Sequence, residues 1–561
     1  MRTLKRVNNI NQKLNMTNNL KADVVIIGAG AVGGMLAYRL SQSGVNVLLL
    51  ESGPRINRGE AVQTYFNSTD KGANAPYPST AYAPHPMSSK DHYVQAGPDN
   101  FNGSYLRGVG GSSWHWTGFG MGFRPNDFKM KSLFGVGVDW PIGYADLQSY
   151  YETIEKEWGV GGDAGYDHGT PRRVPYPLPG VPMSYSDQRI SVACKDAGFT
   201  IGPFIHARNS VVFDGRPPCC GSASCAPICP IGAKYDGSVH VAKAEAAGTR
   251  LMAETVVDKI LVGANKQISG VTYRQSNSER GTATAKIYIL CAHAIESPKL
   301  LLLSKQENAP QGVANSSDAV GRYLMTQAEL DTRALAKDPL YPYRGPTTTG
   351  GIMEFRDGAF RKDYAAVGTS FMNRGWRSGL GPMQTANRLV KAGLVGAPMR
   401  QALHDQSARE LAINSSAETL PEASNRIVPD YTQLDASGTP RPKVYFRIDE
   451  YTKRGLEQLR LRHQVIVKAL ECTDITSDEF STASAIIAGT TRMGKNAADS
   501  VVDPFCRSHD HANLFVVGTG NFPTMPINAP TMTAVALGLR SLEKIMPDLQ
   551  SGRFNNQAVA A

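Results

Sequence analysis

Residues 23–51 decide the fold of this chain and read DVVIIGAGAVGGMLAYRLSQSGVNVLLLE. Two short apolar runs flank a glycine-rich turn and a helical stretch, which predicts a strand–helix–strand unit. In such a unit Gly28 permits a tight turn, Gly30 lets the backbone approach a pyrophosphate, and Gly33 lets the helix pack against the strand. The pyrophosphate would bind the unpaired N–H groups at the start of the helix. Glu51 ends the second strand, where its carboxylate would bind ribose hydroxyls, so the sequence predicts a Rossmann-like dinucleotide-binding domain.

The length and the charge of the chain limit the number of domains and the kinds of partner that we expect. The chain has 561 residues and 41% hydrophobic content, and a single core rarely grows beyond about 250–300 residues, so we expect two domains. The formal net charge is +10, but residues 1–21 hold five basic residues and no acid, so the body is only mildly basic and we expect no nucleic-acid partner. The polar leader 1–21 is expected to be a disordered basic arm, with contact to an acidic partner or a membrane surface as the alternative.

The sequence contains no targeting or spanning segment that we can identify. The leader lacks the apolar core of about 7–15 residues that marks a secretory signal, and no run of about 18 apolar residues occurs to span a membrane. We therefore expect no membrane span. A chain acting alone would be cytoplasmic, and a chain exported with a partner subunit that carries the signal would act at the periplasmic face of the inner membrane.

The cysteines indicate a metal-binding loop. Four of the eight cysteines lie within residues 219–229, in the order CCGSASCAPIC, followed by Pro230. A tight cysteine group in a large chain favours metal ligation over a disulfide framework, and a C-x₃-C-P ending is typical of iron–sulfur sites. Zinc is the rival, although its sites usually come as paired C-x₂₋₄-C knuckles, and unligated thiols are the remaining alternative.

Three further segments give the chain a resemblance to a known family. These are GVGGSSWHW at 108–116, TTRMG at 490–494 and VVGTG at 516–520. From 22 to 545 the chain resembles the glucose–methanol–choline (GMC) flavoprotein oxidoreductases, and among them the branch with the large subunits of bacterial fructose, gluconate and FAD-glucose dehydrogenases. The resemblance implies a bound FAD and an α/β (α+β) fold, in which a substrate domain built on a mixed sheet covers the isoalloxazine of a Rossmann-like FAD-binding domain.

The resemblance also implies domain boundaries and FAD contacts. We expect 22–324 and 486–548 to form the FAD-binding domain, with a cysteine-rich loop at 205–235. Residues 325–485 would form the substrate domain and 549–561 a flexible tail. His115 would lie against the dimethylbenzene edge of the flavin, either linked covalently to it or simply packed between two tryptophans. The predicted FAD-binding residues are Gly28, Gly30, Gly33, Glu51, Gly110, Gly111, Ser112, His115, Gly520 and Asn521.

In the family branch that the chain resembles, this cysteine segment carries a 3Fe–4S cluster on three thiolates. Carried over to this sequence, Cys219, Cys225 and Cys229 would be the ligands and Cys220 the spare. A flavin accepts two electrons at once, and a nearby cluster can pass them outward one at a time. The resemblance implies that a cytochrome c subunit accepts the electrons and that a small subunit assists export or assembly.

The resemblance breaks at the catalytic base. Family members remove the alcohol proton with a His three residues before the glycine that matches Gly489, and here that position is Ile486. The partnering His or Asn aligns with Ala529, with Asn528 one residue away. A third family position, usually within an Asp-His-Pro stretch, reads TQA at 326–328. An isoleucine cannot accept a proton, so the ordinary alcohol-oxidation mechanism is in doubt.

Three explanations of the missing base remain open at this stage. In the first, the base lies at another position, with Glu329, Asp331, Glu418, His463 or a shifted Asn528 as candidates. Alternatively, the small-molecule substrate needs no base at that place. In the third case the chain is a non-catalytic flavin and iron–sulfur electron-transfer or assembly subunit. We expect an FAD-dependent dehydrogenase that oxidises a sugar, a polyol or another alcohol-like donor and passes electrons through the cluster to a protein acceptor.

Overall fold

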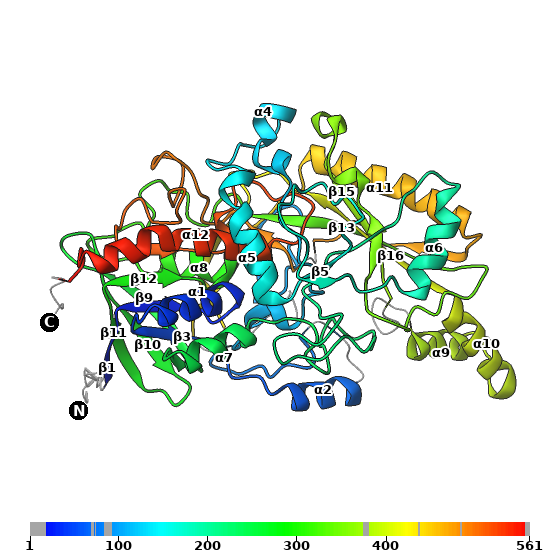
Figure 1. The fold of residues 1–561 in the computed structure, drawn as a ribbon, viewed down its shortest axis with the longest axis horizontal. Helices are drawn as coiled ribbons and strands as arrows, with labels where there is room; N and C mark the ends of the chain where they lie inside the picture. Colours follow the sequence, from blue (N-terminus) through cyan, green and yellow to red (C-terminus); the bar gives the residue numbers. More distant parts are fainter. Residues whose placement is uncertain are drawn as a thin grey trace, which may run out of the picture.

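A parallel five-stranded sheet forms the core of one half of the molecule (Figure 1). The computed structural model describes residues 18–68, 72, 74–83, 92–373, 381–435, 438–482 and 485–555. The strand order is β21-β12-β2-β3-β8, and every neighbouring pair is parallel. Four of these strands are completely buried, which explains their unbroken apolar sequences. The bounds are Val24–Ile27 (β2), Val47–Leu50 (β3), Arg250–Met252 (β8), Ile287–Leu290 (β12) and Leu514–Val516 (β21).

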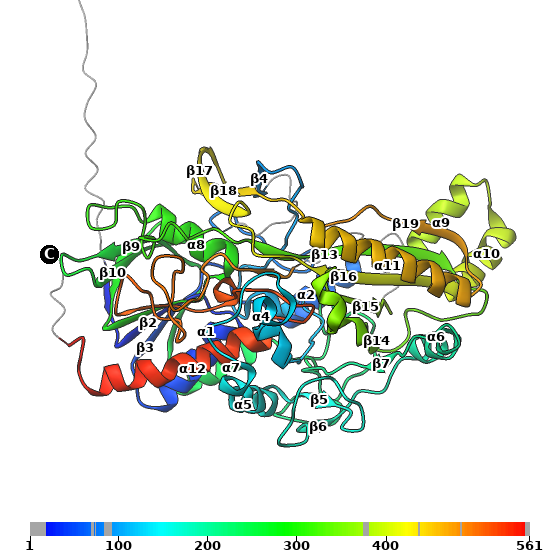
Figure 2. The ribbon, with the colours of Figure 1, turned by 90° about the horizontal axis from the view of Figure 1, so that it is seen from above.

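Helices cover one face of this sheet and a second sheet covers the other (Figure 2). Helix α1 (Ala31–Gln42) follows β2 and packs against α7 (Ser238–Ala246) and α12 (Thr531–Gln550). The other face carries a four-stranded sheet in the order β1-β11-β10-β9 and helix α8 (His293–Leu303). The bounds of its longer strands are Thr255–Val262 (β9), Ile268–Gln275 (β10) and Arg280–Thr284 (β11). The predicted Rossmann-like architecture is confirmed.

Part of each predicted flexible end forms regular structure. Asn18–Lys21 form strand β1, which pairs in parallel with β11, so the end of the predicted disordered leader is part of a sheet. Helix α12 continues to Gln550, two residues into the predicted tail. Residues 1–17 and 556–561 lie outside the described residues.

The substrate side is built on a seven-stranded sheet in the order β19-β13-β16-β15-β14-β7, with β20 pairing to β13. Every pairing in it is antiparallel, so the expected mixed sheet is corrected. Strand β7 comes from the segment predicted for the FAD-binding domain, and α11 (Glu450–Ala469) packs against the sheet. The bounds are Gly202–Pro203 (β7), Met325–Leu335 (β13), Gly350–Ile352 (β14), Val367–Phe371 (β15), Glu410–Glu418 (β16), Thr473–Ser477 (β19) and Ile487–Ala488 (β20).

Smaller elements complete the fold. A three-stranded sheet of β17, β18 and β4 and the pair β5–β6 lie outside the two main sheets. None of the helices in the described ranges combines the length and apolarity that crossing a bilayer requires. The bounds are Arg58–Asn67 (α2), Met130–Phe134 (α4), Gln148–Trp158 (α5), Tyr185–Lys195 (α6), Pro382–Lys391 (α9), Gly396–Arg409 (α10), Val94–Gln95 (β4), Gly161–Gly162 (β5), Leu178–Pro179 (β6), Arg426–Leu434 (β17) and Pro440–Tyr445 (β18).

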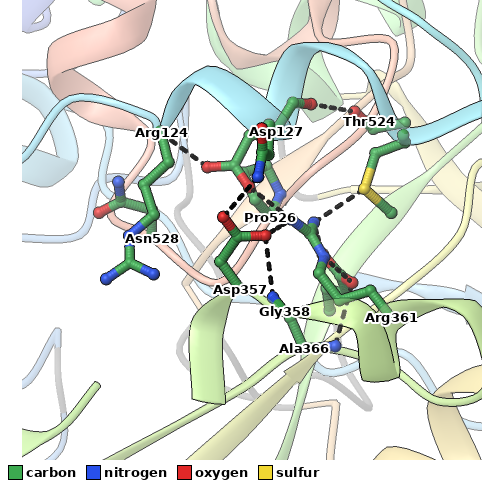
Figure 3. Close-up of polar contacts among 12 residues, drawn as sticks. Arg124, Asp127, Asp357, Gly358, Arg361, Ala366, Thr524, Pro526 and Asn528 are labelled. Atoms are coloured by element: carbon green, nitrogen blue, oxygen red, sulfur yellow. Dashed lines mark hydrogen bonds and ion pairs between the residues drawn. The ribbon is translucent and has the colours of Figure 1, made fainter. Parts of the chain in front are cut away.

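A buried ion network joins the two halves at Arg361 (Figure 3). The Arg361 guanidinium lies 3.0 Å from Asp127, 3.3 Å from Asp357 and 2.9 Å from Glu418. Burial alone would lower the pKa of Arg361, but the charges of Glu418 and Asp127 raise it. Removing one member of a buried ion network leaves charges that neither water nor a partner compensates. Arg361 therefore fixes the end of β16 to the segment that carries Asp127.

Substitution of Arg361 by Met is expected to lower the free energy of unfolding by about 3–5 kcal/mol, because Asp127 and Glu418 would stay buried without their cation. Urea or thermal denaturation monitored by circular dichroism measures the change. The exposed pair of Arg189 with Asp338, separated by 3.5 Å, supplies the control, since Arg189→Met should change little. Equal stabilities of the two variants would contradict a structural role for the network.

Candidate active site

A cavity of about 540 Å³ lies between the two halves. The parallel-sheet side contributes Gly28, Gly30 and Glu51, and the antiparallel sheet contributes Glu329 and Asp331. The cavity volume falls within the range of small-molecule and cofactor sites. Residues that are far apart in the sequence thus meet around one space.

The first glycine turn has the shape that a dinucleotide needs. Gly28 has a φ of +105°, and a Cβ there would lie 2.6 Å from the Cys291 carbonyl oxygen. A Cβ on Gly33 would lie 1.9 Å from the Gly28 carbonyl oxygen, so Gly33 serves packing and does not line the cavity. Helix α1 starts at Ala31 without a side-chain cap, which leaves its first N–H groups for an anion at the cavity.

Glu51 supports the same turn. Its two carboxylate oxygens accept hydrogen bonds from the Ala29 N–H at 2.8 Å and the Gly53 N–H at 2.9 Å. Burial raises the pKa of Glu51 although these N–H groups oppose the shift. A carboxylate has about four acceptor positions, so it can also accept from ribose hydroxyls.

A second glycine turn meets the first. The Gly110 N–H donates to the Ala29 carbonyl at 2.8 Å, and a Cβ on Gly111 would lie 3.0 Å from the Gly30 Cα. Gly110 and Gly111 have φ values of +104° and +59°, which favour glycine. Gly111 and Ser112 line the cavity, whereas Gly110 lies behind them. The two turns form one cradle of backbone.

His115 is buried and lines the same cavity. Its Nδ1 lies 2.8 Å from the Asn74 side-chain oxygen, while the Asn74 amide nitrogen donates to the Tyr105 carbonyl at 3.2 Å. The Asn74 oxygen is therefore an acceptor, which places the His115 proton on Nδ1 and the ring lone pair on Nε2. A covalent link between His115 and the flavin stays a prediction.

The turn at residues 518–521 lines the cavity with the neighbours of the predicted residues and not with those residues themselves. Gly518 and Thr519 line the cavity, whereas Gly520 and Asn521 do not. The Asn521 side chain accepts from the Gly518 N–H at 2.9 Å and donates to the Thr491 carbonyl at 3.1 Å. Gly520 and Asn521 thus shape the turn without lining the cavity. The residue types alone do not distinguish the residues that support this turn from those that face the cavity.

The register of β13 determines which of its polar residues face the cavity on the side opposite the glycine turns. Thr326 pairs with Ile487 in β20, so Gln327 lies next to Ile486, and both line the cavity. Alternate residues of a strand share a face, so Glu329 and Asp331 follow about 7 and 14 Å further along the same face. Asp331 accepts a hydrogen bond from the Asn414 amide at 2.6 Å. Glu329 is therefore the carboxylate on this strand nearer to Ile486.

Asn528 and Ala529 also line the cavity, so the structure brings the three family positions noted in the sequence to one place. The Asn528 side chain donates to the Gly122 carbonyl and accepts from the Ala529 N–H at 2.8 Å. The Gln327 amide donates to the Pro526 and Asn528 carbonyls, both at 3.1 Å. These amides are held by backbone groups and cannot act as bases.

Two predicted base candidates, Glu418 and His463, are corrected because neither lies at the cavity. Glu418 belongs to the Arg361 network and also accepts from the Tyr451 hydroxyl at 2.9 Å. His463 lies on α11, with its ring nitrogens 2.8 Å from the Thr332 hydroxyl and 2.7 Å from the Ser415 hydroxyl. Burial lowers the pKa of His463 to about 4, so it stays neutral in the packed layer between α11 and the sheet.

The cysteine loop lies directly beside the cavity. Cys225 and Cys229 are buried, Cys219 is half-buried and Cys220 is exposed. Ala226, the neighbour of Cys225, lines the cavity together with His115. Within the described ranges no three Cys, His, Asp or Glu side chains form a group that could hold a metal ion. The cluster and the zinc alternative both stay predictions.

Two buried cations, Lys234 and Arg208, lie beside the cysteine loop. The Lys234 ammonium donates to the carbonyls of Trp114, Trp116 and Cys225 at 2.8, 2.6 and 2.7 Å, so it ties the turn that carries His115 to the cysteine loop. Burial alone would raise the pKa of the Cys225 thiol, but the Arg208 charge and hydrogen bonds from Thr347 lower it. These surroundings fit an anionic group on thiolate ligands.

A backbone cradle for a dinucleotide that faces a polar wall across a cavity is typical of an FAD-dependent oxidoreductase. Residues 23–63 match the family model described as FAD dependent oxidoreductase. Residues 107–329 and 421–538 match the amino-terminal and carboxy-terminal models of GMC oxidoreductase. The chain belongs to the GMC oxidoreductase family, whose members act on alcohol-type donors.

Curated relatives span the whole chain. The fructose dehydrogenase large subunit of Gluconobacter japonicus is 36% identical over 95% of this chain and 99% of its own length. The 2-methyl-1,2-propanediol dehydrogenase of Mycolicibacterium austroafricanum is 28% identical over 93% of this chain and 94% of its own. The gluconate 2-dehydrogenase flavoprotein of Pantoea cypripedii is 23% identical over 94% and 93%.

Solved structures confirm the fold. Pyridoxine 4-oxidase from Mesorbium loti superposes with a TM-score of 0.63 at 18% identity, covering 94% of this chain and 99% of its own. Formate oxidase superposes with a TM-score of 0.65 at 15% identity, covering 95% and 100%. At such identities the likeness concerns the architecture alone.

Substitution of Gly30 by Ala is expected to leave the fold intact and to reduce bound FAD at least tenfold. A Cβ on Gly30 meets only the Gly111 Cα, at 4.0 Å, so it fits the protein but stands where the pyrophosphate would lie. Flavin released by denaturation and the circular dichroism spectrum measure the two effects. Gly59→Ala in α2, where a Cβ would lie 3.4 Å from the Asn57 side chain, should keep its flavin. Full flavin content in Gly30→Ala would refute the placement.

Proposed function

We propose that this chain is an FAD-dependent dehydrogenase that oxidises a small hydroxyl-bearing molecule and passes the electrons through a 3Fe–4S cluster to a protein acceptor. Cys219, Cys225 and Cys229 would hold the cluster. The observation that carries the proposal is the position of Ala226, which lines the flavin cavity and directly follows Cys225. A flavin and a cluster at these two places would be neighbours, as electron transfer between them requires.

The burial of the cysteines supports this ligand set. Cys220, the predicted spare, is exposed, whereas the three others are buried or half-buried. The Cys219 sulfur accepts from the Gly221 N–H and the Cys229 sulfur from the Lys234 N–H, both at 3.5 Å. Backbone N–H groups directed at cysteine sulfurs are a common feature of iron–sulfur sites.

The polar wall supports a hydroxyl-bearing substrate. Carboxylate, amide and hydroxyl groups from β13, β15 and β16 face the cavity and can pair with several hydroxyls at once. Fructose, gluconate and 2-methyl-1,2-propanediol, which give three relatives their names, all carry hydroxyl groups. The wall residues are Glu329, Asp331, Ser370, Asn414 and Ser416.

We assign the role of base to Glu329. FAD bound in the cradle would accept the hydride from the substrate carbon. The hydroxyl proton must leave at the same time, and Ile486 cannot take it, whereas Glu329 lies two residues beyond Gln327 on the same face of β13. Transfer of the proton to the Glu329 carboxylate would leave a carbonyl product and balances the reaction.

The proposed acceptor is a cytochrome c subunit, with a small subunit that assists assembly or export to the periplasmic face of the inner membrane. The relative from Gluconobacter japonicus is named as a large subunit, which supports a multi-subunit enzyme. Ile486 and Ala529 at the cavity favour one competing function, a flavin and cluster relay without a substrate of its own.

Spectroscopy of the purified protein tests the proposal. We expect FAD, about three iron atoms per chain and an electron paramagnetic resonance (EPR) signal of the oxidised cluster. Anaerobic addition of sugars and polyols should bleach the flavin and support reduction of an artificial dye. A protein that dithionite reduces but that no hydroxyl compound bleaches would be the relay. A protein without iron would contradict the cluster.

Substitution of Glu329 by Gln is expected to lower kcat about 10²–10⁴-fold, because the amide cannot accept the hydroxyl proton. The Michaelis constant should change far less, since Gln keeps the shape and polarity of the side chain. Steady-state dye reduction, normalised to bound flavin, measures both. Glu418→Gln, at a candidate that lies away from the cavity, should keep kcat even if it lowers stability. An unchanged kcat in Glu329→Gln would remove this residue from the reaction.

A further inference from the structure

Arg208 is a buried cation without a described counter-ion. Its side chain is completely buried. The Nη2 atom donates to the Thr117 carbonyl at 3.0 Å, while Nε and Nη1 have no hydrogen-bond partner within the described part of the chain. An isolated charge in the interior costs several kcal/mol, so a structure that keeps one there normally supplies an anion.

Arg208 lies beside the cysteine loop. Its backbone pairs with Lys234 in an antiparallel bridge, and the next residue, Asn209, accepts from the Cys219 N–H at 2.9 Å. The Arg208 guanidinium donates to the Thr117 carbonyl, next to the Trp116 carbonyl that the Lys234 ammonium binds together with the Cys225 carbonyl. The unpartnered atoms of the guanidinium are therefore buried beside the segment that carries the three cysteines.

The negative charge of an iron–sulfur cluster would explain why a buried arginine lies here without a protein counter-ion. A 3Fe–4S cluster on three thiolates is negatively charged in both oxidation states and gains one more negative charge on reduction. A fixed positive charge stabilises the reduced form more than the oxidised form, and it thereby raises the reduction potential. Lys234 carries a second buried positive charge beside the loop, but its ammonium directs its hydrogen bonds at three carbonyls, whereas Nε and Nη1 of Arg208 have no partner among the described residues.

We propose that Arg208 is the built-in counter-charge of the cluster and raises its reduction potential, so that electrons pass readily from the reduced flavin. This inference rests on the proposed function, since it requires the cluster. Arg208 would act on the cluster through its charge and would not touch the substrate. It is therefore not a catalytic residue and takes no part in proton removal.

The test is a potentiometric titration of the holoenzyme followed by EPR, with iron and flavin determined on every sample. Arg208→Gln removes the charge and keeps a polar side chain, and Arg208→Lys keeps the charge. We expect the equilibrium constant for one-electron reduction to fall about tenfold in Arg208→Gln, which corresponds to a shift of about 59 mV to lower potential. Arg208→Lys should recover most of the shift.

Arg356→Gln is the matched control. Arg356 is also buried, donates to the His168 carbonyl at 3.1 Å and has an unpartnered Nε within the described residues, but it lies away from the cysteine loop. Its loss should leave the potential unchanged.

Each outcome decides between the two proposals. Loss of iron from Arg208→Gln with flavin retained, and its recovery in Arg208→Lys, would support the counter-charge as well. Equal potentials and iron contents in wild type and Arg208→Gln would overturn it and leave the cluster in place. Equal potentials in the Lys and Gln variants would also overturn it, because shape and not charge would then matter. A wild-type protein without iron or signal would overturn the cluster and this role together.

Discussion

The contact between two glycine turns is the constraint on which the rest of the structure depends. Backbone meets backbone where the Gly110 N–H donates to the Ala29 carbonyl and Gly111 packs on Gly30. A Cβ on Gly110 would lie 2.4 Å from the Trp114 indole nitrogen and one on Gly111 3.0 Å from the Gly30 Cα, so glycine is required on that side of the contact, which fixes the start of α1 relative to the segment that carries His115. The cavity, the cysteine loop beside it and the sheet that closes it are all placed relative to this cradle.

The nucleotide half could be predicted from the sequence because its signals are local. The order of strand, glycine turn, helix and terminal acid lies within residues 23–51, and each member has its own physical reason. Strand β1 was missed because its pairing with β11 joins residues more than 260 positions apart. A polar four-residue segment carries no periodicity that would reveal such a partner.

The wall opposite the cradle could be predicted only in part. Residue type identified Glu329, Asp331, Glu418 and His463 as possible bases, but only the strand register shows which of them face the cavity. Glu418 pairs with Arg361, and His463 on α11 lies between two hydroxyl groups of the sheet, because partners from distant segments satisfy both side chains. A single sequence does not reveal which distant residues become partners in the fold. Arg208 escaped notice for the same reason, since an arginine without an anion is recognisable only in three dimensions.

The Lys234 ammonium has a consequence for electron tunnelling. The rate of tunnelling falls exponentially with the separation of donor and acceptor, so a thermal change of an ångström in that separation would alter it severalfold. The Lys234 ammonium donates to the carbonyls of Trp114 and Trp116, on either side of His115, and also to the carbonyl of Cys225. For a flavin at His115 and a cluster at Cys225, the edge-to-edge gap would therefore be set by one short, buried bridge, and it would stay constant while the outer parts of the molecule move.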